Sequence, residues 1–272
     1  MLTAITRGTS MSIADCTLTY ISRMPIDVAK AIQQQIAYER CLTELGVPVI
    51  SLGVEDDLPD SVFVQDTALV LDEVAILAAM GVKKRQPEIE SVAKVLSLYR
   101  EVKRLNGPAS LEGGDIMRIG NNLYIGLSGR TNGEGIAQLQ EILRPFRYQV
   151  KPVEVSACLH LSTGCAYLGQ NTVLVNRSWV NVSQLEGVDI IEVPESEPWA
   201  ANVLTIGDII LMSSSFSETR ELLTRRGFQV QTIDISEFEK AEGSLTCLSL
   251  LLDIEETERH SLTNHHLPRG QL

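Results

Sequence analysis

The feature that most constrains the fold is a recurring pair of short apolar segments separated by a small polar turn. Three such pairs begin at equal intervals, at Asp66, Asp115 and Gly164, and a fourth begins at Asn202 after a shorter interval. The pairs occupy residues 66–81, 114–129, 164–178 and 202–215, and a fifth would join 244–253 to the opening segment LTAITRG. Such a recurrence predicts an array of similar units rather than one irregular domain.

Helical patterns separate the predicted hairpins. Amphipathic segments lie at 26–46, 87–105, 133–146 and 217–227. Short strands follow, such as VPVISLG, YQVKPVEV and FQVQTIDI. The predicted unit is therefore hairpin, helix, strand, repeated about five times. Such α/β units can close into a circle when the last strand pairs with the first unit, which removes exposed sheet edges.

A doubly wound parallel sheet is the alternative architecture. Hairpins dominate the pattern, however, and no GxGxxG motif opens a helix after the first strand. No linker or low-complexity segment interrupts the sequence, so residues 1–255 are predicted to form a single domain. Residues 256–272 are predicted to form a polar C-terminal tail, and we expect His265 and His266 to belong to that tail rather than to a metal site.

The net charge of the chain excludes some classes of binding partner. The chain has 23 Lys and Arg against 35 Asp and Glu, a net charge of -12 at pH 7. Nucleic-acid binding needs a concentrated positive surface, and docking on an anionic membrane is equally disfavoured. A cationic or zwitterionic small molecule is electrostatically compatible with such a chain.

The cysteine content points to a reducing environment. The five cysteines are widely spaced and form no CxxC pair, so neither a disulfide scaffold nor a structural zinc site is expected. The N-terminal segment MLTAITRGTSMSIADC lacks the apolar core of a signal peptide, and no apolar stretch approaches the roughly 20 residues of a membrane span. We therefore expect a soluble cytoplasmic protein.

Several polar residues stand at the ends of predicted strands. Asp66 begins an apolar strand, Glu112 and Asp115 flank two glycines, and His160 lies between two leucines. Each has an ordinary structural interpretation, such as a solvated glycine turn or a hydrogen-bonded core histidine. Cys247, between EGS and LSLLL, should enter the last strand, where most buried cysteines are inert.

A joint catalytic role for Cys247 and His160 becomes more plausible if the repeat brings the ends of their strands to one axis. A cysteine needs a nearby imidazole to form a thiolate near pH 7, and a histidine needs an acid to fix its tautomer and charge. Glu112, from a third unit, could be that acid. The order Glu, His, Cys differs from that of papain-type enzymes, but such sets are defined by geometry rather than by order.

Five motifs in order resemble the dimethylarginine dimethylaminohydrolases, namely PDSVFVQDTA, LEGGD, GLSGRTN, HLSTG and EGSLTCLSLLL. The resemblance covers about residues 2–253 and implies a five-bladed α/β-propeller of the pentein fold. It implies that Cys247 is the nucleophile, His160 the general acid and base, and Glu112 the carboxylate that orients the histidine. The implied reaction converts Nω-methylated arginine to citrulline and a methylamine through a covalent cysteine-thiouronium intermediate, with no metal or other cofactor.

The resemblance also implies a set of substrate contacts. Asp66 corresponds to the carboxylate that holds the guanidinium, and Asp60 with the main chain of Leu18 to the site for the α-amino group. Arg85 and Arg130 correspond to two arginines that bind the α-carboxylate, a role that suits the guanidinium fork.

One position departs from the family pattern. Gln65 stands where the family usually has glutamate, so an acceptor oxygen is kept but a negative charge is lost. The substrate could therefore be methylated arginine, arginine itself or another alkylguanidine, and a deiminase, a dihydrolase or an amidinotransferase is the enzyme alternative. A non-catalytic pentein-fold binding protein is the alternative outside enzymes, although it would have no chemical need for Cys247, His160 and Glu112. A monomer or a homodimer is expected.

Overall fold

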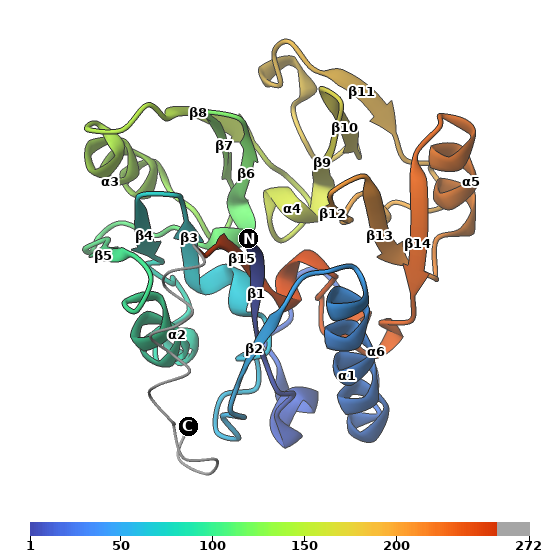
Figure 1. The fold of residues 1–272 in the computed structure, drawn as a ribbon, viewed down its shortest axis with the longest axis horizontal. Coiled ribbons are helices and arrows are strands. Elements are labelled where there is room, and N and C mark those ends of the chain that lie inside the picture. Colours follow the sequence, from blue (N-terminus) through green and yellow to red (C-terminus); the bar gives the residue numbers. More distant parts are fainter. Residues whose placement is uncertain (255–272) are drawn as a thin grey trace.

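The computed structural model describes residues 1–254 of the chain. Within them, five three-stranded sheets are arranged around a central axis, and the longer helices lie on the outer side (Figure 1). Each sheet contains one antiparallel and one parallel pair of strands. The predicted tail at 256–272, with His265 and His266, lies outside the described residues.

Four of the sheets are continuous in sequence, and the first sheet combines both ends of the described chain. Its order is β15 (Leu250–Asp253), β1 (Leu2–Arg7) and β2 (Val49–Leu52). The other sheets are β3 (Ala68–Val70), β4 (Val74–Leu77) and β5 (Glu101–Arg104); β6 (Ile116–Ile119), β7 (Asn122–Leu127) and β8 (Gln149–Glu154); β9 (Cys165–Gly169), β10 (Thr172–Val175) and β11 (Asp189–Glu192); and β12 (Leu204–Ile206), β13 (Ile209–Ser213) and β14 (Gln229–Ile233).

All five predicted strand pairs are present as antiparallel pairs. The pair that closes the ring places Leu2 opposite Asp253 and Ile5 opposite Leu250. In each sheet a third strand then joins in parallel, as the repeat predicts. Because β1 pairs with both β15 and β2, the N-terminal strand lies in the middle of the first sheet and has no exposed edge.

Four units contain the predicted helix, and the fourth does not. The helices are α1 (Val28–Glu44), α2 (Glu88–Leu96), α3 (Gly133–Leu143) and α5 (Ser217–Arg225). Between β10 and β11 the chain forms only the 3₁₀ turn η5 (Val182–Gln184).

The helix predicted at 87–105 is too long. α2 ends at Leu96, and Glu101–Arg104 forms β5, which pairs in parallel with β4. Leu98, which follows the apolar residues of α2 in sequence, is 58% exposed. The backbone of β4 needs a partner on its second edge, and this non-local requirement outweighs the local helical pattern.

The apolar core is divided into five clusters of buried side chains around the axis. In one of them Val92 of α2 packs with Leu77 of β4, and in the next Leu139 of α3 packs with Leu123 of β7. Because every sheet has a core on both sides, the inner strands are fixed relative to one another. The segments that lead into these strands therefore meet at one end of the axis.

Among residues 1–254, no helix has the length and apolar character needed to cross a membrane.

Candidate active site

Four short turns meet at the axis, and each leads directly into the inner strand of a sheet. They are η2 (Val64–Thr67) before β3, η4 (Gly113–Asp115) before β6, α4 (Leu161–Gly164) before β9 and η6 (Thr246–Leu248) before β15. The turns pack tightly, since a Cβ on Gly113 would lie 2.0 Å from the carbonyl oxygen of Gln65. Only glycine allows this approach.

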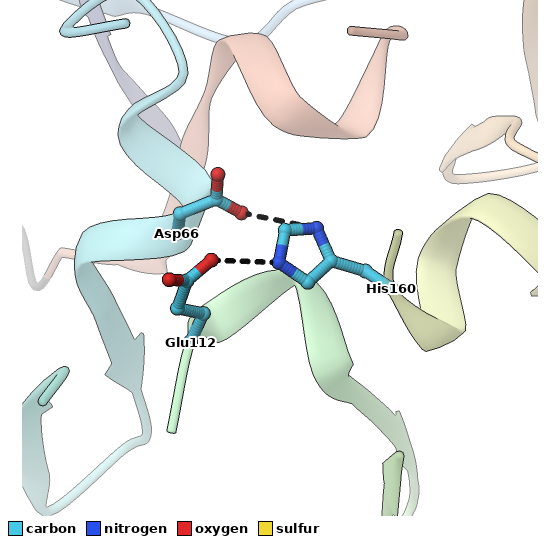
Figure 2. A group of neighbouring side chains, drawn as sticks. All are labelled: Asp66, Glu112 and His160. Atoms are coloured by element: carbon cyan, nitrogen blue, oxygen red, sulfur yellow. Dashed lines mark hydrogen bonds and ion pairs between the residues drawn. The ribbon is translucent and has the colours of Figure 1, made fainter. Parts of the chain in front are cut away.

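His160 and Glu112 form a buried pair in these turns (Figure 2). Nε2 of His160 lies 2.8 Å from Oε2 of Glu112, and the two residues are 1% and 0% exposed. Burial opposes the imidazolium charge, but Asp66, the hydrogen bond to Glu112 and the charge of Asp115 raise the pKa of His160 to about 9. The raised pKa favours the imidazolium at neutral pH, and the hydrogen bond holds its ring against the carboxylate of Glu112.

Asp66 lies on the other side of the imidazole and presents one free oxygen. Its Oδ2 accepts a hydrogen bond of 2.9 Å from Nη1 of Arg85. Its Oδ1 lies 3.7 Å from Nδ1 of His160 and, within residues 1–254, accepts no hydrogen bond. A buried carboxylate oxygen without a donor is costly unless a ligand supplies one. This oxygen is therefore available to a cation.

Cys247 lies in η6, just before β15, rather than inside the strand. Its turn packs against the turn that carries Asp66, and the residue is 7% exposed. Burial, followed by the negative charge of Asp66, raises the pKa of Cys247 to about 12. The prediction that Cys247 enters the strand was wrong because the chain must still turn toward the axis before it can pair with β1.

Arg85 is held between two carboxylates. Nε and Nη2 donate to Glu88 over 3.0–3.2 Å, and Nη1 donates to Asp66. Burial opposes the arginine charge, but Asp66 and Glu88 raise the pKa of Arg85. Burial also raises the pKa of Glu88 to about 7, although Arg85 opposes this. The sequence analysis missed Glu88; its position three residues after Arg85, at the start of α2, was the available signal.

The predicted binding residues Asp60 and Arg130 are bridged by the segment 17–21. Asp60 accepts hydrogen bonds from the main-chain nitrogen and the hydroxyl of Thr17, at 3.1–3.2 Å. Nη2 of Arg130 donates to the hydroxyl of Thr19 at 3.2 Å, and its Nη1 lies 3.5 Å from Oε1 of Glu112. Leu18 lies between these anchors and packs against the first apolar cluster. Three residues that the sequence placed in one site thus lie along one loop.

Glu242 holds the same loop from the opposite side. Its carboxylate accepts the main-chain N–H groups of Thr19, Tyr20 and Ile21, at 2.7 Å for Thr19 and 2.8 Å for Ile21. Its own φ is +57°, in the left-handed region, where a non-glycine residue is strained. The sequence analysis missed Glu242, because an acid in a glycine turn has an ordinary structural interpretation.

Gln65 borders a separate cavity. Gln65, Ser162 and Thr246 line a space of about 540 Å³ between the inner strands, and within residues 1–254 Gln65 Oε1 has no hydrogen-bond partner. None of Asp66, Glu112, His160 and Cys247 lines this space. Gln65 therefore borders the axial cavity from the same turn that carries Asp66 toward His160.

The acidic cluster could also be compared with a metal site. Ligand atoms of Asp66, Glu112 and His160 lie within 4.8 Å of one another. Nε2 of His160, however, is hydrogen-bonded to Glu112, and this nitrogen of a protonated imidazole has no lone pair to offer a metal. The arrangement is that of one imidazole between two carboxylates.

Comparison with known proteins identifies the family. The family model described as N,N dimethylarginine dimethylhydrolase, eukaryotic, matches residues 23–252. The N(G),N(G)-dimethylarginine dimethylaminohydrolase of Pseudomonas aeruginosa is 36% identical over 226 residues, which cover 82% of this chain and 89% of that protein. The protein of the same name from Streptomyces coelicolor is 36% identical over 250 residues, covering 92% and 96% of the two chains.

A solved structure agrees with these sequence matches. The dimethylarginine dimethylaminohydrolase of Pseudomonas aeruginosa, as a cysteine-to-serine variant complexed with citrulline, superimposes with a TM-score of 0.88 at 35% identity. The match covers 93% of this chain and 100% of that one. The predicted five-bladed α/β-propeller is confirmed by this match and by the five sheets. The chain belongs to the dimethylarginine dimethylaminohydrolase family.

Proposed function

We propose that this chain hydrolyses Nω-methylated arginine, either dimethylarginine or monomethylarginine, to citrulline and a methylamine. The observation that carries the proposal is the buried Oδ1 of Asp66, which within residues 1–254 accepts no hydrogen bond and lies next to both the His160–Glu112 pair and the turn of Cys247. A guanidinium N–H is a suitable donor for this oxygen. The citrulline bound to the Pseudomonas aeruginosa relative is the product expected of such a reaction.

The first step is attack by Cys247. A guanidinium is a poor electrophile, because addition to its carbon destroys both the resonance and the charge, so it must be held next to a strong nucleophile. Burial is the main cause of the raised pKa of Cys247, and the negative charge of Asp66 is the second. A cation bound to Asp66 offsets that charge and so lowers the pKa of the thiol. The thiol then releases its proton to solvent, and Sγ forms a bond to the guanidinium carbon.

His160 handles the protons of the following steps. As an imidazolium it donates a proton to the methylated nitrogen, and the C–N bond breaks to release the amine and leave a thiouronium on Cys247. The neutral imidazole then takes a proton from water, whose oxygen attacks the same carbon. The C–S bond breaks, citrulline leaves, and the hydroxyl proton of the new carbonyl returns to sulfur. Glu112 keeps the ring in place and stabilises its charged form.

The polar end of the substrate would occupy the groups along the loop. Asp60 and the main chain of Leu18 would bind the α-amino group, and Arg130 and Arg85 the α-carboxylate. Arg85 has N–H groups left for this, since only Nε, one N–H of Nη1 and one of Nη2 are needed for Asp66 and Glu88.

The test is a product assay on the purified protein. Dimethylarginine should give citrulline and dimethylamine in equal amounts, and Cys247→Ser should abolish both. Cys41→Ser is the matched control, because Cys41 is a buried cysteine in α1 whose sulfur contacts Gln231. An unchanged rate in Cys247→Ser would remove Cys247 from the mechanism.

A substrate series separates the alternatives. Turnover of arginine alone, with release of ammonia, would favour a deiminase or a dihydrolase, and transfer to an added amine would favour an amidinotransferase. Binding without turnover would favour a non-catalytic protein. Gln65→Glu adds a charge beside Asp66: a marked change in KM would place residue 65 within reach of the substrate, and an unchanged KM would place it outside the site.

We further propose that residues 1–255 act as one catalytic domain in a reducing compartment, the cytoplasm. All five cysteines are free thiols, which supports this location. Every proposed site residue comes from one chain, so a monomer or a homodimer would contain complete sites. Light scattering on the active enzyme would measure the assembly.

A further inference from the structure

We propose that Asp115 is a positioning residue that fixes Glu112, His160 and Arg130 relative to one another. The inference rests on the function proposed above, but it concerns a residue that plays no part in that mechanism. Asp115 is fully buried in η4, directly behind the His160–Glu112 pair. Its two carboxylate oxygens connect the segments that carry these three residues.

The first connection leads to His160. Oδ1 of Asp115 accepts a hydrogen bond of 2.9 Å from the main-chain nitrogen of Leu161. Leu161 is the first residue of α4, and His160 is the N-cap residue before it. The bond therefore fixes the turn from which the imidazole projects.

The second and third connections pass through two hydroxyl groups. Oδ2 of Asp115 contacts Oγ of Ser128 at 2.6 Å and Oγ1 of Thr131 at 2.7 Å. Thr131 Oγ1 in turn accepts the main-chain N–H of Glu112 at 3.2 Å. Ser128 Oγ accepts the main-chain N–H of Arg130 at 3.0 Å. One carboxylate thus reaches the backbone of Glu112 and of Arg130.

The pattern of donors fixes the charge of Asp115. Ser128 Oγ accepts the main-chain N–H groups of Arg130 and Thr131, which fills its acceptor positions and leaves its proton to be donated to Asp115. Thr131 Oγ1 accepts the N–H of Glu112 and donates its proton to the same carboxylate oxygen. The N–H of Leu161 is the third donor. A carboxyl group that receives three donors and offers none is a carboxylate. Burial raises the pKa of Asp115, but His160 and the three donors oppose this.

The space that Asp115 occupies also depends on a glycine in the neighbouring strand. A Cβ on Gly126, in β7, would lie 2.6 Å from Oδ1 of Asp115 and 2.9 Å from Cβ of Leu161. No side chain fits there while Asp115 holds its present position. Gly126 is therefore needed to leave room for the bond between Asp115 and Leu161.

Asp115 also contributes to the charge around His160. The carboxylates of Asp66, Glu112 and Asp115 face the imidazole from η2, from the residue before η4 and from η4 itself. The cations that face these carboxylates are Arg85, bonded to Asp66, and Arg130, whose Nη1 lies 3.5 Å from Oε1 of Glu112. Removing the charge of Asp115 without changing its shape should therefore favour the neutral imidazole.

The experiment compares Asp115→Asn with Asp208→Asn, an exposed control in the turn between β12 and β13. Asp115→Asn should lower kcat roughly 10- to 100-fold, in the range of other supporting-shell changes. It should also move the high-pH limb of the kcat profile down by about one pH unit. The control should change neither. A wild-type kcat and profile in Asp115→Asn would overturn the proposal, as would a loss of stability that leaves the profile unmoved.

A second pair of variants applies if Asp115→Asn does not fold. Thr131→Val removes the connection to Glu112, and Thr131→Ser keeps the hydroxyl. The first should show the same shift of the pH profile and the second should restore it. Equal profiles in the two variants would contradict the connection through Thr131.

A titration without substrate keeps this test separate from the proposed activity. His160 is the only histidine in residues 1–254, and a His160→Asn spectrum assigns its imidazole resonance in NMR. The His160 pKa should fall by about one unit in Asp115→Asn whether or not methylarginine is the substrate. An unchanged pKa would refute the role of Asp115, whereas loss of methylarginine turnover in the wild type would refute only the proposed function.

Discussion

Nδ1 of His160 and Oδ1 of Asp66 face each other across 3.7 Å, and Gly114 borders the space between them (Figure 2). A Cβ on Gly114 would lie 2.7 Å from each of these two atoms. The space is too wide for a normal hydrogen bond and is kept open by the absence of a side chain. A planar guanidinium edge bound to Asp66 would therefore lie beside the ring that is to protonate its leaving group.

The two neighbouring glycines should respond differently to alanine. At Gly114 the obstructed atoms belong to the side chains of Asp66 and His160 rather than to the backbone, so Gly114→Ala should fold but displace one of these side chains and lower kcat/KM at least 100-fold. At Gly113 the Cβ would meet the main-chain oxygens of Gln65 and Ala68 at 2.0 and 2.7 Å. Gly113→Ala should therefore destabilise the fold by about 2–4 kcal/mol. Urea unfolding and steady-state kinetics on both variants test this contrast, which an active Gly114→Ala would contradict.

The reactivity of Cys247 should depend on a bound cation. Because burial raises the pKa of Cys247 to about 12, iodoacetamide should alkylate it slowly at pH 7 and faster as the pH rises through the alkaline range. A guanidinium ligand without a reactive substituent should raise the thiolate fraction, as seen in absorbance at 240 nm. Fast alkylation at pH 7 in the free enzyme would show instead a preformed thiolate.

The His160–Glu112 pair should make stability pH-dependent. The folded-state pKa of about 9 lies above the ordinary histidine value of 6.5, so the imidazolium stabilises the fold below pH 6.5. That contribution is lost as the pH rises from 6.5 through 9, and on the order of 3 kcal/mol of unfolding free energy should disappear. Urea titrations at pH 6 and pH 10 measure the difference. His160→Gln should lack this component, and an equal loss in the variant would assign it to other groups.

Glu242 should control the loop at residues 17–21. Glu242→Gln loses the charge that holds three main-chain N–H groups, so hydrogen exchange at Thr19 and Ile21 should speed up and KM should rise about tenfold. Glu239→Gln is the matched control, because Glu239 bonds Ser213 and Ser215 instead. If both variants have the same KM and exchange rates, Glu242 does not hold the loop.

The sequence predicted the sheets better than their helices. Each hairpin has a local signal, a polar turn between two short apolar runs, and this signal is present wherever the unit lies in the chain. The end of α2 had no such signal, since apolar residues continue from Leu96 into β5. Only the unpaired edge of β4 decides that Glu101–Arg104 becomes a strand.

The candidate active site was harder to predict from the sequence than the fold. His160 and Cys247 each read as core residues when taken singly; the repeat suggested that they meet near Glu112, and the family motifs implied the role of each. The supporting acids Asp115 and Glu242 were not recognised, because their partners are distant in sequence. Asp115 bonds Leu161 across 46 residues, and Glu242 bonds Thr19 across 223. The periodic pattern of apolar residues does not predict such pairings, because they form only when the five sheets come together.

The pairing of β1 with β15 has a consequence for how the enzyme becomes active. Cys247 lies just before β15, so the segment with the proposed nucleophile joins the molecule through its most distant sequence contact. Contacts of high sequence separation carry the largest loop-closure entropy and tend to form late in folding. A chain with four sheets formed would already hold Asp66, Glu112 and His160 yet be chemically inert. Folding and activation would thus share their final step, and the recovery of thiol reactivity during refolding would record the moment at which the two ends meet.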